Sequence, residues 1–596
     1  MNRKLLILFS VAIMILPMAF GQKLIITPYE KSEKTETMTY EEILRYSRLF
    51  DSVSNVIKYI PAGKTGNGYD IPLLICDASA QFDPIAAQKS GKAVLLIQAG
   101  VHAGEPDGTD AGMMLFRDIA CRKIRPPENL IILFFPTINP EGCLRRSAFN
   151  RINQNGPKEM GWRTNAANKN LNRDYIKAET PEIQCFLEVF NTWKPDMFID
   201  CHTTDGADYQ YVVTYDLTDA GILNNEQNKW QTEKYLQPLL SLMEQKGLPM
   251  FRYVTFKQWH NPKSGLVRWI PSPLLSEGYA AVRNRPGLLI ETHMLKPYSQ
   301  RVDGTYEILK YTADLLDKQH AEIVAMNRKA DTEVAGLAGY KTRIPVEFNS
   351  LGDSVIVDFK GVAYEVQKSS LTGGDWFQYS HTPENQKIWY FSNPKPVAFV
   401  SLPVAYVFEP AWKNVVELLD IHGIEYTITS EAKTFQVQAY RLTGARFSPE
   451  PYEGIQRLTS FSTDTLIFTK TFPTGSIIVP TATNRARLLA YMFEPASGAS
   501  LVRWGFFNAV FEQKEYCESY VMEPLAREML KDDKELNKEF QEKMKTDSEF
   551  AASQRAILNW FYQKTEYWDQ TKDVVPVYRL NSLTLEPVKP NLELKR

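Results

Sequence analysis

After residue 20 the sequence lacks any apolar run long enough to span a membrane. It also lacks an excess of charge, because 68 basic and 70 acidic residues leave a net charge of −2. This balance argues against a basic surface for nucleic acid and against an acidic disordered chain. The composition therefore predicts a globular protein whose partner is a small or extended substrate. A chain of 596 residues is expected to form two or more domains.

Cysteine is scarce, with six residues and no Cys-x-x-Cys pair. This excludes a dense disulfide scaffold, although single disulfides remain open in an exported chain. Neither the disulfide pairing nor the oligomeric state is predicted.

The first 21 residues are typical of a signal peptide. A short basic start, Met1 to Lys4, precedes an apolar run over 5–20, and Ala19 and Gly21 supply the small residues that favour cleavage before Gln22. An uncleaved anchor is the alternative, but the run is short and contains Pro17. We therefore expect a periplasmic or secreted protein with no membrane span after cleavage.

The next part of the chain alternates between strand and helix patterns. Apolar runs typical of buried strands lie at 93–99, 130–135, 197–201 and 287–290, and helical patterns lie at 38–60, 108–121, 181–193, 232–246 and 303–328. This alternation predicts an α/β sheet covered by helices on both faces.

The pattern of the sequence changes past residue 335, where short strand-like runs are followed by a charged helical stretch. We expect a domain boundary near residue 330, with 22–330 as the first domain. Residues 331–596 are predicted to form a mixed α+β accessory region, β-rich and then helical, whose role is open.

Three of the predicted strands are followed by residues that can bind a metal. His102 and Glu105 follow the strand at 93–99, His202 follows 197–201, and Glu291 follows 287–290. Sites in open α/β sheets collect at the carboxyl ends of strands. Imidazole and carboxylate groups are zinc ligands, and a catalytic zinc takes three from the protein. We therefore predict a site for one zinc ion per chain at this edge of the sheet.

The same His-x-x-Glu spacing recurs at His381 and Glu384. That pair lies in a polar, proline-containing stretch that no buried strand precedes, so we interpret it as a surface loop.

Six segments together resemble the zinc carboxypeptidase family, which includes the pancreatic carboxypeptidases A and B and bacterial relatives. They are HAGE at 102–105, PTINPEG at 136–142, Arg163, NLNRDY at 170–175, DCHTTDG at 200–206 and IETHM at 290–294. The resemblance covers about 38–325 and implies a zinc-carboxypeptidase-like mixed sheet.

The resemblance also implies roles for matched residues. His102, Glu105 and His202 resemble the zinc ligands, and Glu291 resembles the general base that activates water and protonates the leaving amine. The residues matched to substrate groups are Arg163 for the scissile carbonyl and Asn172 with Arg173 for the terminal carboxylate.

Some positions depart from the family pattern. Asn170 stands where many relatives carry the Asp that orients the first zinc histidine. The tyrosine of the family's substrate loop has no clear match: Tyr279 is a candidate, while Trp269 lies nearer the expected distance. Alternatives to Arg163 are Arg145, Arg146 and Arg151, and Arg173 could instead pair with Asp174. His293 is predicted to pack beside the site.

The resulting prediction is an exported zinc metallocarboxypeptidase that acts on a peptide or peptide-like substrate with a free carboxylate. The alternatives are an amidohydrolase of murein peptides or N-acyl amino acids that uses the same zinc site, and an inactive peptide-binding protein.

Overall fold

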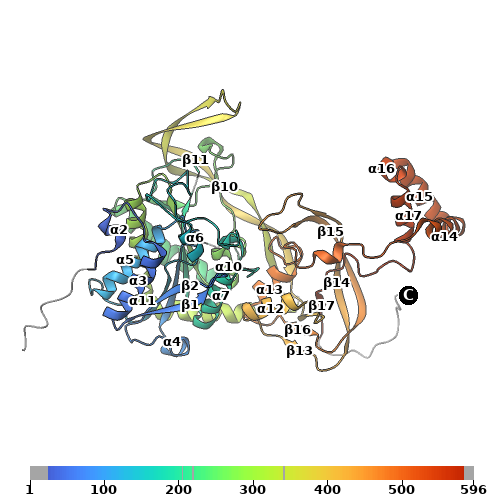
Figure 1. Ribbon diagram of the computed structural model, residues 1–596, viewed down its shortest axis with the longest axis horizontal. Helices are drawn as coiled ribbons and strands as arrows, with labels where there is room; N and C mark the ends of the chain where they lie inside the picture. Colours follow the sequence, from blue (N-terminus) through green and yellow to red (C-terminus); the bar gives the residue numbers. More distant parts are fainter. Residues whose placement is uncertain (1–24, 205, 218–220, 340–341, 583–596) are drawn as a thin grey trace, which may run out of the picture.

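The structure, a computed structural model, describes residues 25–204, 206–217, 221–339 and 342–582. The predicted signal peptide lies outside these residues. Across the described ranges, no helix has the length and apolar character that a membrane crossing requires. Figure 1 shows an N-terminal region (25–339) and an accessory region (342–582), which begins with a projecting hairpin and whose last helices stand apart.

The N-terminal region is built on a mixed sheet of eight strands. In spatial order the strands are β1 (Ile57–Lys64), β2 (Asp70–Cys76), β4 (Leu130–Phe135), β3 (Ala93–Ala99), β5 (Met197–Thr204), β9 (Gly287–His293), β6 (Val213–Leu217) and β7 (Met250–Arg252). The central strands β4, β3, β5 and β9 are parallel, and antiparallel strands flank them. The predicted mixed α/β sheet is confirmed.

Helices cover both faces of this sheet. Along β3, Leu95 and Ile97 pack on one face and Leu96 on the other, as the two-residue period of a strand requires. The first face carries α3 (Tyr40–Val53), α5 (Asp107–Ala120) and α11 (Tyr298–Ala335), and the second carries α7 (Pro181–Trp193) and α10 (Ser276–Val282). Helix α5 lies close to the sheet because a Cβ at Gly112 would be 2.2 Å from the Phe134 ring.

Shorter helices complete the region. They are α2 (Pro28–Lys31), α4 (Pro84–Ser90), α6 (Pro140–Leu144), α8 (Asn225–Lys229) and α9 (Gln237–Gln245), with single turns η2 (Leu171–Arg173) and η4 (Pro262–Ser264) and a π-helical segment η3 (Trp230–Leu236).

The first predicted helix is shorter than expected. Thr39 and Glu42 form the capping box that begins α3. The helix ends at Val53, however, and the next residues enter β1, which pairs with β2. Tertiary pairing therefore overrides the helical pattern expected up to residue 60.

The accessory region begins with a long hairpin, β10 (Arg343–Lys368) and β11 (Asp375–Ser401). This hairpin pairs back with β8 (Leu266–Val267) of the N-terminal region. A six-stranded sheet follows, in the order β13 (Thr427–Ile428), β16 (Ile477–Pro480), β12 (Ala405–Phe408), β17 (Tyr578–Leu580), β14 (Lys433–Phe447) and β15 (Leu458–Phe472). The helices are α12 (Lys413–Ile421), α13 (Ala486–Phe493), η5 (Asn508–Phe511), α14 (Ser519–Asp532), α15 (Lys534–Thr546), α16 (Ser548–Ala551) and α17 (Gln554–Tyr562).

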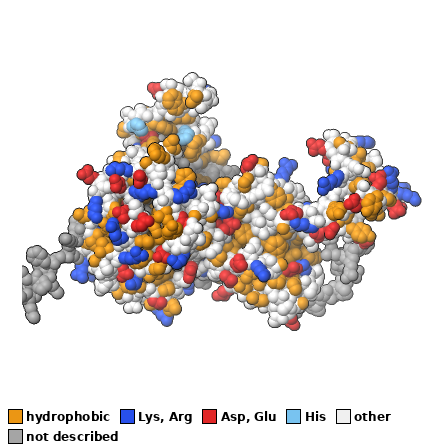
Figure 2. Space-filling model, in the orientation of Figure 1, with side chains coloured by type: hydrophobic (Ala, Val, Ile, Leu, Met, Phe, Trp, Pro, Cys, Tyr) orange, Lys and Arg blue, Asp and Glu red, His pale blue; other side chains and the backbone are white. Residues whose placement is uncertain are grey.

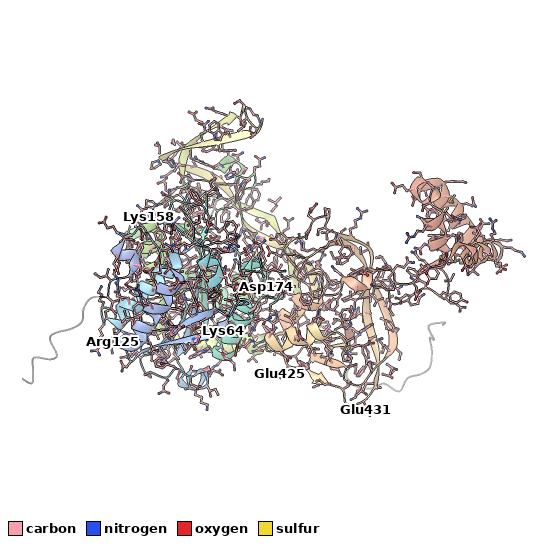
Figure 3. The ribbon with its side chains drawn as sticks, in the orientation of Figure 1. Lys64, Arg125, Lys158, Asp174, Glu425 and Glu431 are labelled. Atoms are coloured by element: carbon pink, nitrogen blue, oxygen red, sulfur yellow. The ribbon has the colours of Figure 1, made fainter. Side chains whose placement is uncertain are left out.

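The two regions share one apolar core, in which α7 packs against α12 and α11 packs against α13. Asn191 Nδ2 of α7 also donates a hydrogen bond to the Ile421 carbonyl at 2.8 Å. Asp174 lies on the side of the N-terminal region that faces the accessory region, and Lys158 lies on the opposite side (Figure 3). Helix α11 runs through the predicted boundary at residue 330, which stays a prediction.

Acidic and basic side chains alternate over the visible face of the molecule (Figure 2). This face therefore carries no single-sign patch of the kind that nucleic acid attracts.

Candidate metal centre

The carboxyl ends of three parallel strands bring the predicted site together. β3 leads into the turn that carries His102 and Glu105, while β5 and β9 carry His202 and Glu291. In the β5–β9 register His202 is the direct partner of Glu291. Gly100 allows the turn after β3, because its φ is +66° and a Cβ there would lie 2.8 Å from the Thr137 hydroxyl.

His102, Glu105 and His202 converge in a buried cluster. His102 Nδ1 lies 3.1 Å from Glu105 Oε1, and His202 Nδ1 lies 2.9 Å from Glu105 Oε2. The three donor atoms lie within 4.8 Å of one another, and no other such group occurs among the described residues. Two imidazoles and one carboxylate are the donor set of a catalytic zinc site.

The outer nitrogen of each imidazole has its own polar partner. His102 Nε2 lies 2.9 Å from Asn170 Oδ1, and His202 Nε2 lies 2.7 Å from Asp200 Oδ2. An acceptor at Nε2 keeps the proton there and leaves the Nδ1 lone pair for a metal. The arrangement therefore fits zinc bound through both Nδ1 atoms and Glu105. Asp200 was not predicted, although its position two residues before His202 on one strand places both on the same face.

The pKa values follow from burial and from these neighbours. Burial lowers the pKa of His102 to about 4, which favours the neutral imidazole that binds metals. Burial opposes the charge of His202 too, but Asp200 and Glu105 raise its pKa well above the usual value. Burial likewise opposes ionisation of Glu105, yet His102 and Arg151 hold its pKa well below the usual range. A metal ion binds the neutral form of each imidazole.

Two arginines reach the cluster. Arg163 Nη1 lies 3.3 Å from Glu105 Oε1, and Arg151 Nη1 lies 2.8 Å from the same oxygen. The structure thus brings together the predicted Arg163 and one of its alternatives. Arg145 instead packs over the Trp162 ring, and Arg146 binds Glu159 at 3.2 Å.

A cavity of about 130 Å³ opens over the cluster. The predicted residues that line it are His102, Glu105, Arg163, Asn172, Arg173, His202 and Glu291. Asn172 Oδ1 accepts a hydrogen bond from the Ser276 amide at 3.1 Å, and Arg173 Nε donates to the Tyr452 hydroxyl at 3.1 Å. Asp174 accepts from the Thr180 amide and hydroxyl at 2.9 and 2.7 Å. Asp174 is thus bound by Thr180, and Arg173, its predicted alternative partner, lines the cavity.

Two carboxyl groups with raised pKa values face the same cavity. Burial, with the nearby Glu105 and Glu277, raises the pKa of Glu291 to about 8. Burial and the nearby Asp200 raise the pKa of Glu277 to about 7. Glu277 was missed from the sequence, where it resembles any acidic residue of a helix start.

The structure does not bring Tyr279 to this cavity. Its side chain is fully buried, and its hydroxyl lies 2.8 Å from His422 Nδ1 and accepts from Arg283 Nη1 at 2.6 Å. Tyr279 belongs to the face of α10 that packs into the shared core. The aromatic residues that line the cavity are Trp269 and Tyr253.

The remaining histidines near the site have other partners. His293 is buried beside the site and lies 3.2 Å from Asp208, in keeping with a packed role. The pair at His381 and Glu384 belongs to strand β11, so the expected loop is wrong. Glu384 pairs with Gly361 of β10, whereas His381, with a φ of 60°, lies in the irregular stretch between the paired residues Tyr379 and Pro383. His381 has a side chain that is 73% exposed, and it pairs with Asp208 at 2.7 Å.

Known proteins match this chain as follows. The family model for zinc carboxypeptidases matches residues 43–269. Carboxypeptidase 2 of Trichophyton rubrum is 22% identical over 502 residues, which are 80% of this chain and 85% of the relative. Carboxypeptidase 2 of Trichophyton equinum is 24% identical over 505 residues, which are 80% of this chain and 84% of the relative.

Two solved structures are also similar. A metallo-carboxypeptidase from Burkholderia cenocepacia is 17% identical, with a TM-score of 0.34, and the match covers 47% of this chain and 69% of that one. A metallo-carboxypeptidase from Pseudomonas aeruginosa, in complex with (2-guanidinoethylmercapto)succinic acid, is 16% identical with a TM-score of 0.35 and the same coverage.

Proposed function

Because residues 43–269 carry a zinc carboxypeptidase domain, we propose that the chain is an exported zinc metallocarboxypeptidase that hydrolyses the C-terminal peptide bond of a peptide. The observation that carries this proposal is the convergence of His102 Nδ1, His202 Nδ1 and the Glu105 carboxylate beside Glu291. Export rests on the signal-peptide pattern of residues 1–21.

His102, Glu105 and His202 would hold the zinc ion. Zinc, when bound, supplies Lewis acidity, which polarises a carbonyl oxygen and lowers the pKa of water. Asn170 and Asp200 orient the two imidazoles from behind.

Glu291 acts as the general base. Its carboxyl group lines the cavity next to the cluster, and its raised pKa of about 8 lies near neutral pH, where proton transfer in both directions is efficient. The carboxylate takes a proton from the attacking water and later passes it to the leaving amine.

The charged side chains of the cavity bind the substrate. Arg163, with Arg151 beside it, offers a guanidinium to the carbonyl oxygen on which negative charge develops. Asn172 and Arg173 would bind the terminal carboxylate, since an arginine fork pairs with a carboxylate through two parallel hydrogen bonds.

Glu291→Gln tests the mechanism. The substitution keeps the size of the side chain but removes its basicity. We expect one zinc per chain, as in the native protein, and turnover of a peptide reduced by a factor of 10² or more. Unchanged turnover would reject Glu291 as the base.

A peptide and its C-terminal amide test the substrate class. Cleavage of the free acid alone is expected, and equal cleavage of both would reject the proposed roles of Asn172 and Arg173. Parallel assays with a murein peptide and an N-acyl amino acid separate a carboxypeptidase from the alternative amidohydrolases.

A further inference from the structure

A turn of the accessory region lies against the segment that lines the proposed active site. The loop between β14 and β15 folds into a tight hairpin, in which the Tyr452 amide donates to the Ile455 carbonyl at 3.0 Å and the Ile455 amide donates back at 3.1 Å. We call residues 452–455 the β14–β15 turn. It contacts the segment 169–173 of the N-terminal region, which carries Asn170, Asn172 and Arg173.

Three polar contacts join the turn to that segment. Glu453 Oε2 accepts a hydrogen bond from the Asn170 amide at 2.8 Å. The Glu453 carbonyl accepts from Lys169 Nζ. The Tyr452 hydroxyl accepts from Arg173 Nε at 3.1 Å. The contacting residues are far apart in the sequence: 279 residues separate Arg173 from Tyr452, and 283 separate Asn170 from Glu453.

The backbone of Glu453 has a strained conformation in this turn. Its φ is 53° and that of Gly454 is 74°, so both central residues of the turn have the positive φ that glycine and asparagine favour. A glutamate with positive φ costs roughly 1–2 kcal/mol. Strain of this kind persists where the surrounding structure holds it and points to a functional role. Here the strained residue is the one whose carboxylate binds Asn170.

One residue, Asn170, connects these contacts with the metal ligand His102. Asn170 Oδ1, which faces His102 Nε2 at 2.9 Å, also accepts from the Asn172 amide at 3.0 Å. Glu453 accepts its hydrogen bond from the backbone amide of this same Asn170. Glu453 therefore fixes the residue that orients His102, and Tyr452 fixes the guanidinium of Arg173.

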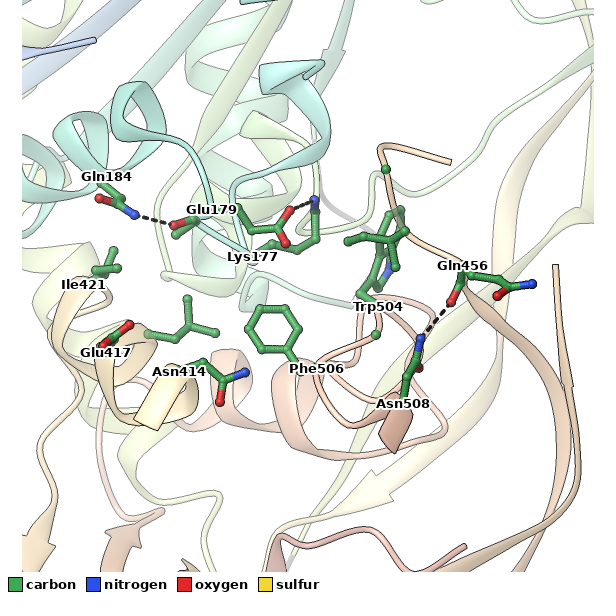
Figure 4. Close-up of a pocket in the computed structure, with 15 residues that line it drawn as sticks. Lys177, Glu179, Gln184, Asn414, Glu417, Ile421, Gln456, Trp504, Phe506 and Asn508 are labelled. Carbon is green, nitrogen blue, oxygen red and sulfur yellow. Dashed lines mark hydrogen bonds and ion pairs between the residues drawn. The ribbon is translucent and has the colours of Figure 1, made fainter. Parts of the chain in front are cut away.

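A cavity and an aromatic side chain flank the turn. A cavity of about 590 Å³ lies beside it, lined by Gly454 and Gln456 of the accessory region and by Lys177 and Glu179 of the N-terminal region (Figure 4). The turn is supported from its own side, where the Tyr452 ring lies 6.1 Å from the Trp504 ring. Lys177 Nζ of the N-terminal region lies 5.2 Å from the centroid of the same Trp504 ring. The shared core and this contact hold the two regions together, and the polar contacts set how the turn meets residues 169–173.

On this geometry, and resting on the proposed function, we propose that the β14–β15 turn is a positioning element of the active site. Glu453 orients His102 through Asn170, and Tyr452 orients Arg173 towards the terminal carboxylate of the substrate. The accessory region is then a part of the active-site architecture and not an independent module.

Glu453→Gly tests the first arm. Glycine adopts a positive φ without strain, although the substitution also removes the carboxylate. The melting temperature is therefore expected to stay within a few degrees of native or to rise. Zinc affinity, measured by competition with a chromophoric chelator, is expected to fall roughly 3- to 10-fold, less than the 10- to 100-fold typical of a direct partner of a ligand. Glu453→Gln, whose amide oxygen can still accept from Asn170, is expected to restore most of the affinity.

Asp573→Gly is the matched control, because Asp573 is another accessory-region residue with positive φ, 63°. It is expected to leave zinc affinity unchanged. An unchanged zinc affinity in Glu453→Gly, or an equal loss in Asp573→Gly, would overturn the arm. Because zinc binding is read directly, this result is independent of whether the chain cleaves peptides.

Tyr452→Phe tests the second arm, and it also serves if Glu453→Gly fails to fold. Loss of the hydroxyl is expected to raise KM for a free-carboxylate peptide about 3- to 10-fold, the equivalent of one hydrogen bond, with kcat and zinc affinity near native values. Tyr520→Phe, at a tyrosine of α14 that is 77% exposed, is the control. An unchanged KM in Tyr452→Phe while the native chain is active overturns this arm, whereas an inactive native chain overturns the proposed function.

Discussion

Replacing Asn170 tests the link between the metal ligands and their surroundings. Asn170→Ala removes the oxygen that faces His102 Nε2 at 2.9 Å and accepts from the Asn172 amide at 3.0 Å. Loss of such a partner typically lowers metal affinity 10- to 100-fold, or about 1.4–2.8 kcal/mol of binding free energy. The two buried donors left unpaired should also lower the free energy of unfolding of the metal-free protein by about 1–3 kcal/mol.

Asn170→Asp supplies the opposite change at the same place. A carboxylate keeps both acceptor contacts, and its charge makes His102 more basic, so zinc should bind more tightly than in the native protein. Both variants are compared with the native chain by chelator competition at one pH, with unfolding in denaturant measured after zinc is removed. A zinc affinity of Asn170→Ala within twofold of native, with normal folding, would refute the idea that Asn170 orients His102.

Three further predictions concern the ligands, the base and the substrate. His202→Ala should lose the zinc, whereas His381→Ala should retain one zinc per chain by metal analysis. In the metal-free protein, the free energy of unfolding should fall as pH rises from about 4.5 towards 8, because native Glu291 keeps a proton that the unfolded chain releases. Denaturant titrations of Glu291→Gln should show a weaker fall. Arg173→Ala should raise KM for a free-carboxylate peptide roughly 10- to 100-fold, the loss of a charged, two-bond contact.

Each of these predictions has a clear contrary result. Zinc retained in His202→Ala would exclude that residue as a ligand, and zinc lost in His381→Ala would transfer the site to the hairpin. Equal pH dependence in native and Glu291→Gln proteins would show that Glu291 has an ordinary pKa. A native KM in Arg173→Ala would leave the terminal carboxylate without its proposed partner.

The sequence by itself determined the elements that build the site. The apolar runs at 93–99 and 130–135 correspond to β3 and β4, and the helical pattern at 181–193 corresponds to α7. Local periodicity reports which face of each element is buried. Since the ends of parallel strands meet at one edge of a sheet, the positions of His102, Glu105 and His202 followed from the strands that precede them.

Only the tertiary structure decided which distant side chains reach those ligands. The sequence pattern does not reveal how α10 is rotated, and its rotation buries Tyr279 in the shared core while Glu277 faces the cavity. Likewise, Arg151 and Arg163 both reach Glu105 because an irregular loop folds back over the site. Glu453 contacts Asn170 across 283 residues, and such a contact depends on how two regions dock, which no local period of apolar residues encodes.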